Sequence, residues 1–121
     1  MSRKRILHIE VSSLEASLSQ FKSTWKRATR GERVAPYRGV AFESMAQLLA
    51  TITPRRWELT ERLRREGPMT VYGLAKLLER NYKNVHGDVK ALEERGLIAR
   101  TKDGCVEVPW DEVAAHMRFA A

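Results

Sequence analysis

The chain has 121 residues, enough for one small domain or a domain with an appendage, and 43% of them are hydrophobic, enough for a packed core. No apolar run reaches the roughly 18 residues of a transmembrane helix, and a single cysteine excludes an internal disulfide, so we expect a cytoplasmic protein with no membrane partner. The net charge of +7 favours an anionic partner, although residues 1–50 carry nine Lys and Arg against four acids and residues 51–121 carry thirteen against eleven.

Residues 1–44 are expected to form an N-terminal strand–helix–strand extension. Residues 5–11 alternate apolar and polar side chains, as a strand does, and residues 39–44 resemble a second short strand. Between them, one face of an amphipathic helix is formed by Leu14, Leu18, Phe21 and Trp25. Because such a stripe must be buried, we expect the extension to build a homodimer or to bind a partner protein. The alternative is that it caps the rest of the chain.

Residues 45–121 are expected to form a second domain that begins with helices. The segment ESMAQLLATI predicts a short helix. In the segment that follows, Thr53 suits the N-cap and Pro54 the first helical position, and the helix should end at Gly67. A further helix should begin after Thr70 and end near residue 80.

The next helix, residues 81–95, follows almost at once, which is the order of a helix-turn-helix. Val85, Val89 and Leu92 recur at helical spacing and should point inward. Residues 97–100 and 105–108 predict a β-hairpin around Asp103–Gly104, and residues 110–121 predict a terminal helical tail. The expected fold class is therefore α+β, a winged helix-turn-helix with an N-terminal extension.

The outward face of the 81–95 helix carries side chains suited to DNA. An asparagine can hydrogen-bond a base edge, lysines can reach phosphate or guanine, and tyrosine and histidine suit sugar and phosphate contacts near the helix start. Hairpin cations suit the minor groove or the backbone. The candidate DNA-binding residues are Tyr82, Lys83, Asn84, His86, Gly87, Lys90, Arg100 and Lys102. The simpler alternative is a solvated helix face.

Gly87 leaves that face without a side chain near its middle. Glycine inside a helix costs roughly 1 kcal/mol relative to alanine, so its presence calls for a reason. Either the helix backbone approaches DNA closely there, or base reading has weakened and phosphate attraction and protein partners dominate.

The segment GPMTVYGLAKLLERNYKNVHGDVKALEERGLI resembles the winged helix-turn-helix of MarR-like regulators. With TPRRWEL and VPWDEV around it, the chain is most similar to a group of DNA-binding proteins that includes TumA-like antitoxins, over about residues 40–113. The resemblance implies a homodimeric transcriptional regulator that binds double-stranded DNA. For the antitoxins of the group it also implies autoregulation and a cognate toxin protein as partner. Similar sequences usually carry arginine where this chain has Gly87, so base reading does not carry over to that position.

Other classes of site find little support. His8, His86 and His116 are too dispersed, with one cysteine, for a metal-ligand spacing, and no cofactor motif is present. The chain has no nucleophile elbow, phosphate loop or paired carboxylates, so no enzyme is expected. The alternative to a DNA-binding regulator is a protein-interaction module of the same fold that neutralises a toxin or scaffolds a complex.

Overall fold

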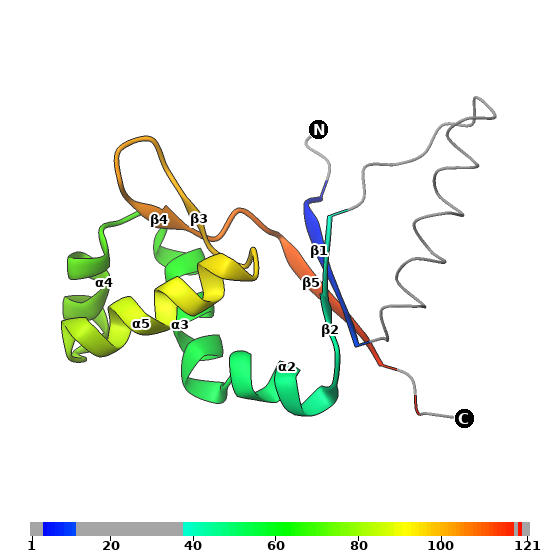
Figure 1. Cartoon of the computed structure of the whole chain (residues 1–121). Helices are drawn as coiled ribbons and strands as arrows, with labels where there is room; N and C mark the ends of the chain where they lie inside the picture. Colours follow the sequence, from blue (N-terminus) through cyan, green and yellow to red (C-terminus); the bar gives the residue numbers. More distant parts are fainter. Residues whose placement is uncertain (1–3, 12–37, 118, 120–121) are drawn as a thin grey trace.

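The computed structural model describes residues 4–11, 38–117 and 119 (Figure 1). The chain is mixed α and β, as the expected α+β class requires. In chain order its elements are β1 (Ile6–Val11), β2 (Gly39–Phe42), α2 (Met45–Thr51), α3 (Pro54–Glu66), α4 (Val71–Leu78), α5 (Tyr82–Glu94), β3 (Ala99–Arg100), β4 (Val106–Glu107) and β5 (Glu112–Met117). The helix predicted from Leu14 onward, with its apolar stripe, lies outside the described residues.

β1 is the central strand of a three-stranded sheet in the order β2-β1-β5. Both of its neighbours run parallel to it, with Ile9 opposite Val40 on one side and opposite Ala115 on the other. All the helices α2–α5 and the β3–β4 hairpin lie in sequence between the two outer strands (Figure 1). Strands from both expected segments, residues 1–44 and 45–121, therefore belong to one sheet.

The prediction of a helical tail after Pro109 is wrong, because residues 112–117 form strand β5. The register pairs all six residues of β1 with β5, from Ile6 opposite Glu112 to Val11 opposite Met117. The start of the strand is fixed by Arg5, whose backbone oxygen accepts from the N–H of Asp111 at 2.8 Å and whose own N–H donates to the Asp111 carboxylate at 2.9 Å. Residues 112–117 contain alanine and have some local preference for a helix. Pairing with the edge of β1 that β2 leaves open outweighs this preference.

The largest cluster of buried residues joins the helices to the hairpin. It contains Leu59 and Leu63 of α3, Leu74 of α4, Val85, Val89 and Leu92 of α5, and Leu97, Ile98 and Val106 of the hairpin. A smaller cluster of Ile9, Phe42 and Leu48 lies between the sheet and α2. Ile52 and Val113 pack against both clusters, so the sheet and the helices share a continuous apolar interior.

Each helix from α3 to α5 begins at a capping side chain that accepts a backbone N–H three residues ahead. Thr53 caps α3 ahead of Pro54, as predicted, and Thr70 caps α4. Asn81 caps α5 by accepting from the N–H of Asn84 at 3.3 Å. These caps set where the helices start and so keep the turn between α4 and α5 short.

The hairpin after α5 is present but shorter than predicted. Its strands pair only Ala99 with Glu107 and Arg100 with Val106. Met69, just before α4, forms a bridge to the other side of Val106, with backbone hydrogen bonds of 2.8 and 3.2 Å. The hairpin is thereby attached to the entry of α4, and its loop projects beyond the three helices (Figure 1).

Candidate nucleic-acid interface

α4 and α5 pack against each other across a turn of Glu79, Arg80 and Asn81. Glu79 has φ 54° and ψ 44°, the left-handed conformation, and its N–H donates to the carbonyl oxygens of Ala75 and Lys76. This backbone geometry reverses the chain within a few residues. The predicted adjacency of the two helices is confirmed.

α5 has one face in the core and one face in solvent. Val85 and Leu92 are fully buried and Val89 is 1% exposed, as their spacing predicted. On the other side, the predicted site residues Tyr82, Lys83, Asn84, His86, Gly87 and Lys90 are all exposed. The structure therefore brings together six of the eight candidates on one helix surface.

Gly87 lies on this exposed surface in open space. A Cβ atom built on it would meet no heavy atom within 4 Å, apart from its own helix backbone and chain neighbours. Nothing in the packing of the described residues therefore requires glycine at this position. The packing of these residues does not explain the missing side chain. Either a partner at this surface requires glycine, or no contact at this surface requires a side chain.

The two hairpin candidates differ in their surroundings. Lys102 is exposed in the loop between β3 and β4. Arg100 instead forms a two-pronged ion pair with Glu93 of α5, its Nε and Nη2 donating to the two carboxylate oxygens at 3.2 and 3.1 Å. This hydrogen bonding lowers the pKa of Glu93 and raises that of Arg100. Arg100 thus ties the hairpin to α5 while its side chain stays partly exposed, whereas Lys102 is exposed in the loop.

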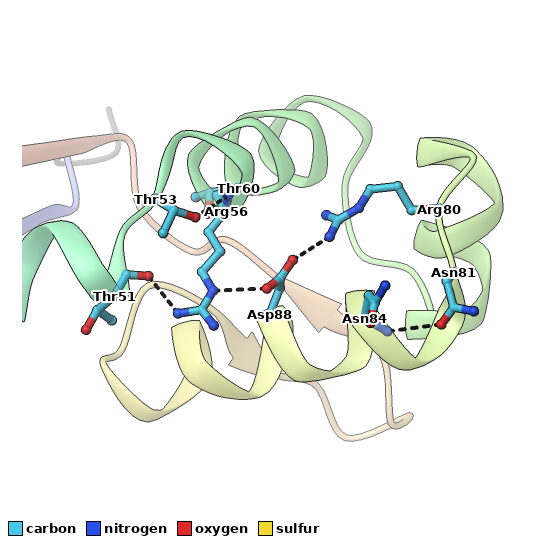
Figure 2. Close-up of polar contacts among 8 residues, drawn as sticks. All are labelled: Thr51, Thr53, Arg56, Thr60, Arg80, Asn81, Asn84 and Asp88. Atoms are coloured by element: carbon cyan, nitrogen blue, oxygen red, sulfur yellow. Dashed lines mark hydrogen bonds and ion pairs between the residues drawn. The ribbon is translucent and has the colours of Figure 1, made fainter.

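Asp88 is a structural residue beneath the candidate surface of α5, and the sequence did not single it out. Its carboxylate accepts from Arg56 of α3 at 3.0 Å and from Arg80 of the turn at 2.7 Å (Figure 2). Arg56 also donates to the carbonyl oxygen of Thr51 at 3.0 Å. The sequence did contain an indication of this role, because Asp88 stands between the core residues Val85 and Val89 and falls toward the inward side of the helix. A carboxylate placed there needs cationic partners.

The surface also extends onto α4, which the sequence reasoning did not include. The ring of Tyr72 lies 6.4 Å from that of Tyr82, and Tyr82 lies 5.8 Å from His86. The ammonium group of Lys76 lies 5.3 Å from the centre of the Tyr72 ring. Tyr72 and Lys76 are one helical turn apart on the side of α4 away from Leu74, a spacing that could have revealed them.

The histidines are less dispersed in space than in sequence. His8 and His116 lie on neighbouring strands with their rings stacked at 6.4 Å, whereas His86 is on α5. Within the described ranges, no three His, Cys, Asp or Glu side chains gather in a way that could hold a metal ion. No helix in the described part of the chain is long and apolar enough to cross a membrane.

A comparison with known protein families identifies the family of this chain. Residues 51–115, from the end of α2 to within β5, match the profile of the HVO_A0114 family. The chain belongs to the HVO_A0114 family. No curated protein matches it, and no solved structure does either. The matched region contains the helices α3–α5, the hairpin and every candidate residue, so the candidate surface lies within the part of the chain that the family profile covers.

Proposed function

We propose that this protein is a DNA-binding transcriptional regulator in which α3–α5 and the β3–β4 hairpin act as a winged helix-turn-helix. The observation that carries the proposal is the division of α5. Its inner face is fully buried, and its outer face exposes Tyr82, Lys83, Asn84, His86 and Lys90 within three turns. An α-helix with such a face fits the major groove of B-form DNA.

The side chains suggest a role for each part of the surface. Asn84 can both donate to and accept from an adenine edge, since its backbone N–H alone is used by the Asn81 cap. Lys83 and Lys90, one on each side of Gly87, suit phosphate or guanine. Lys102 at the hairpin loop suits the flanking backbone or minor groove. Because one such helix reads only a half-site, we propose that the protein binds its operator as a homodimer.

The second candidate is a protein-interaction module that neutralises a toxin or scaffolds a complex. Two observations favour it. Three arginines, Arg56, Arg80 and Arg100, are paired with acids of α5, and the first two are largely shielded from solvent. Gly87 leaves the centre of the surface without a contact group. An autoregulating antitoxin would combine both functions in one chain.

A titration of the protein with the duplex upstream of its own gene tests the first candidate. We expect binding that weakens steeply with salt, because phosphate contacts release counterions. The double variant Lys83→Ala/Lys90→Ala should weaken binding to every sequence and lower the salt slope by about 1.8, or about 0.9 per phosphate contact. Lys4→Ala is a control that removes one positive charge on the sheet side of the molecule, where Lys4 is paired with Glu112. No binding by the native protein at low salt would contradict direct regulation and leave the interaction module.

A further inference from the structure

Four side chains form a continuous strip across the two packed helices, which we call the aromatic strip: Tyr72 and Lys76 of α4, and Tyr82 and His86 of α5. Successive rings along it are 6.4 and 5.8 Å apart, and Lys76 is held 5.3 Å from the Tyr72 ring centre. Two elements therefore contribute to one surface, which begins on α4 and leads onto the proposed reading face of α5.

The aromatic strip has no role in the core. Tyr72 is 61% exposed and Tyr82 is 49% exposed, whereas the hydrophobic core of α4 and α5 is provided by Leu74, Val85 and Leu92. Large side chains clustered in solvent are costly unless something covers them, and such clusters mark interaction sites. The cation–π contact and the tilted ring pairs restrict these side chains before any partner arrives.

The positive charge in and beside the aromatic strip favours an anionic partner. Lys76 lies within it and Lys83 lies beside Tyr82, and both are exposed. By contrast, Asp88 of α5 is turned inward to Arg56 and Arg80, and Glu93 is held by Arg100. The surface thus combines cations, hydroxyl donors and apolar ring faces. Phosphates pair with the first two, and the deoxyribose can cover the third.

We propose that the aromatic strip binds the sugar–phosphate backbone of one DNA strand beside the groove that α5 enters, and so places α5 in register without reading sequence. The inference rests on the proposed DNA-binding function. Lys76 neutralises one phosphate, while Tyr72 and Tyr82 pack against the adjoining sugar and donate hydroxyl hydrogen bonds. Contacts of this kind position a protein on a duplex but discriminate little between sequences.

Two substitutions separate the parts of this contact. Tyr72→Ala should weaken duplex binding about fivefold on the operator and on a scrambled duplex alike, with the salt slope unchanged, because it removes no charge. Lys76→Ala should also weaken both duplexes and should lower the salt slope by about 0.9, whereas Lys76→Arg should keep the slope. Fluorescence anisotropy with a labelled duplex at several salt concentrations measures affinity and slope together.

The chain offers matched controls. Leu49 of α2 is 61% exposed, the same fraction as Tyr72, so Leu49→Ala removes an equally exposed large side chain from another element. Lys4→Ala removes one positive charge near the sheet. Neither should change affinity by more than about twofold at a salt concentration where exposed charges are screened. Far-UV circular dichroism should show that every variant keeps the native helix content.

The failures of the inference and of the proposed function are distinguishable. If the native protein binds duplex and Lys83→Ala/Lys90→Ala weakens it, but Tyr72→Ala and Lys76→Ala do not, the inference is wrong and the function stands. An effect confined to the operator would assign the strip to base reading and overturn it. Tighter binding to single-stranded DNA than to duplex, lost in Tyr72→Ala, would make the strip a platform for unpaired bases instead. Failure of the native protein to bind any DNA at low salt overturns both.

Discussion

Asp88 and Arg80 form an ion pair of 2.7 Å that joins the inner side of α5 to the turn before it. Their side chains are 16% and 19% exposed, so the pair is largely shielded from water. Arg56 of α3 donates to the second oxygen of the same carboxylate (Figure 2). The Asp88 carboxylate therefore links α5 both to α3 and to the turn before α5. We expect these links to hold the orientation of α5, and with it the position of its exposed face.

Asp88→Asn should lower the free energy of unfolding by about 2 kcal/mol, because two shielded guanidinium groups lose their counter-charge. Urea denaturation, followed by circular dichroism, measures the change. Glu94→Gln is the control, since it neutralises an exposed carboxylate at the end of the same helix. A midpoint for Asp88→Asn equal to that of the control would show that the network contributes nothing to stability.

The Glu93–Arg100 pair should make attachment of the hairpin depend on acid pH. The pKa of Glu93 is lowered in the folded protein from its ordinary value of 4.5, chiefly by the hydrogen bond from Arg100. The stabilisation is therefore fully present above pH 4.5 and is lost as the pH falls through the lower folded pKa. Because the pair is partly exposed, the effect should be small and should weaken with salt.

Glu93→Gln should remove this contribution at neutral pH, so that the difference in stability from the native protein disappears at low pH. Urea midpoints measured at intervals between neutral pH and acid would show the convergence. Arg100→Gln should give the same pH profile, because it removes the other partner. Parallel profiles for native and variant protein across the whole range would contradict the role of the pair.

Secondary structure was predictable wherever local signals agreed with the tertiary contacts. Thr53 with Pro54, and the spacing of Val85, Val89 and Leu92, specified α3 and α5 closely. β5 was mistaken for a helix because its strand character depends on the open edge of β1, more than 100 residues away. Local propensity carries no information about such a partner.

The candidate site was predictable to the same degree. A helical wheel finds which residues of α5 face outward, and all six of those named are exposed. It does not show that Arg100 is paired with Glu93, or that Tyr72 of α4 lies beside Tyr82, because both relations depend on packing between elements. DNA binding and the homodimer stay predictions.

The left-handed conformation of Glu79 suggests a simple gain in stability. At φ 54° a side chain crowds the backbone, which costs about 1–2 kcal/mol, whereas glycine adopts this region freely. Glu79→Gly should raise the free energy of unfolding by about 0.5–1 kcal/mol, after the greater entropy of the unfolded glycine chain is included. Glu79→Ala keeps the Cβ atom and should give no such gain. Equal urea midpoints for the two variants would show that the turn is not strained.

Gly87→Ala should stabilise the folded protein by roughly 1 kcal/mol, because alanine is the better helix former and its Cβ meets open space. Urea denaturation without DNA measures this. Gly73→Ala is an informative comparison within α4, since there a Cβ would lie 3.2 Å from the capping hydroxyl of Thr70. It should give less than the gain seen at Gly87. If Gly87→Ala did not raise the free energy of unfolding, the difference in helix propensity between glycine and alanine would not limit stability at this position.

Gly87→Arg tests whether the bare centre of α5 reflects close approach to DNA or a loss of base reading. Lys83 and Lys90 flank the position, and the space above it is open. An arginine there can reach guanine O6 and N7, a contact that discriminates by about 1–3 kcal/mol. We expect binding about tenfold tighter, with a larger preference for the operator over a scrambled duplex. Gly87→Lys adds the same charge without the paired donors and should tighten binding to both duplexes equally. Loss of binding in both variants would instead show that the helix backbone itself lies against the DNA at Gly87.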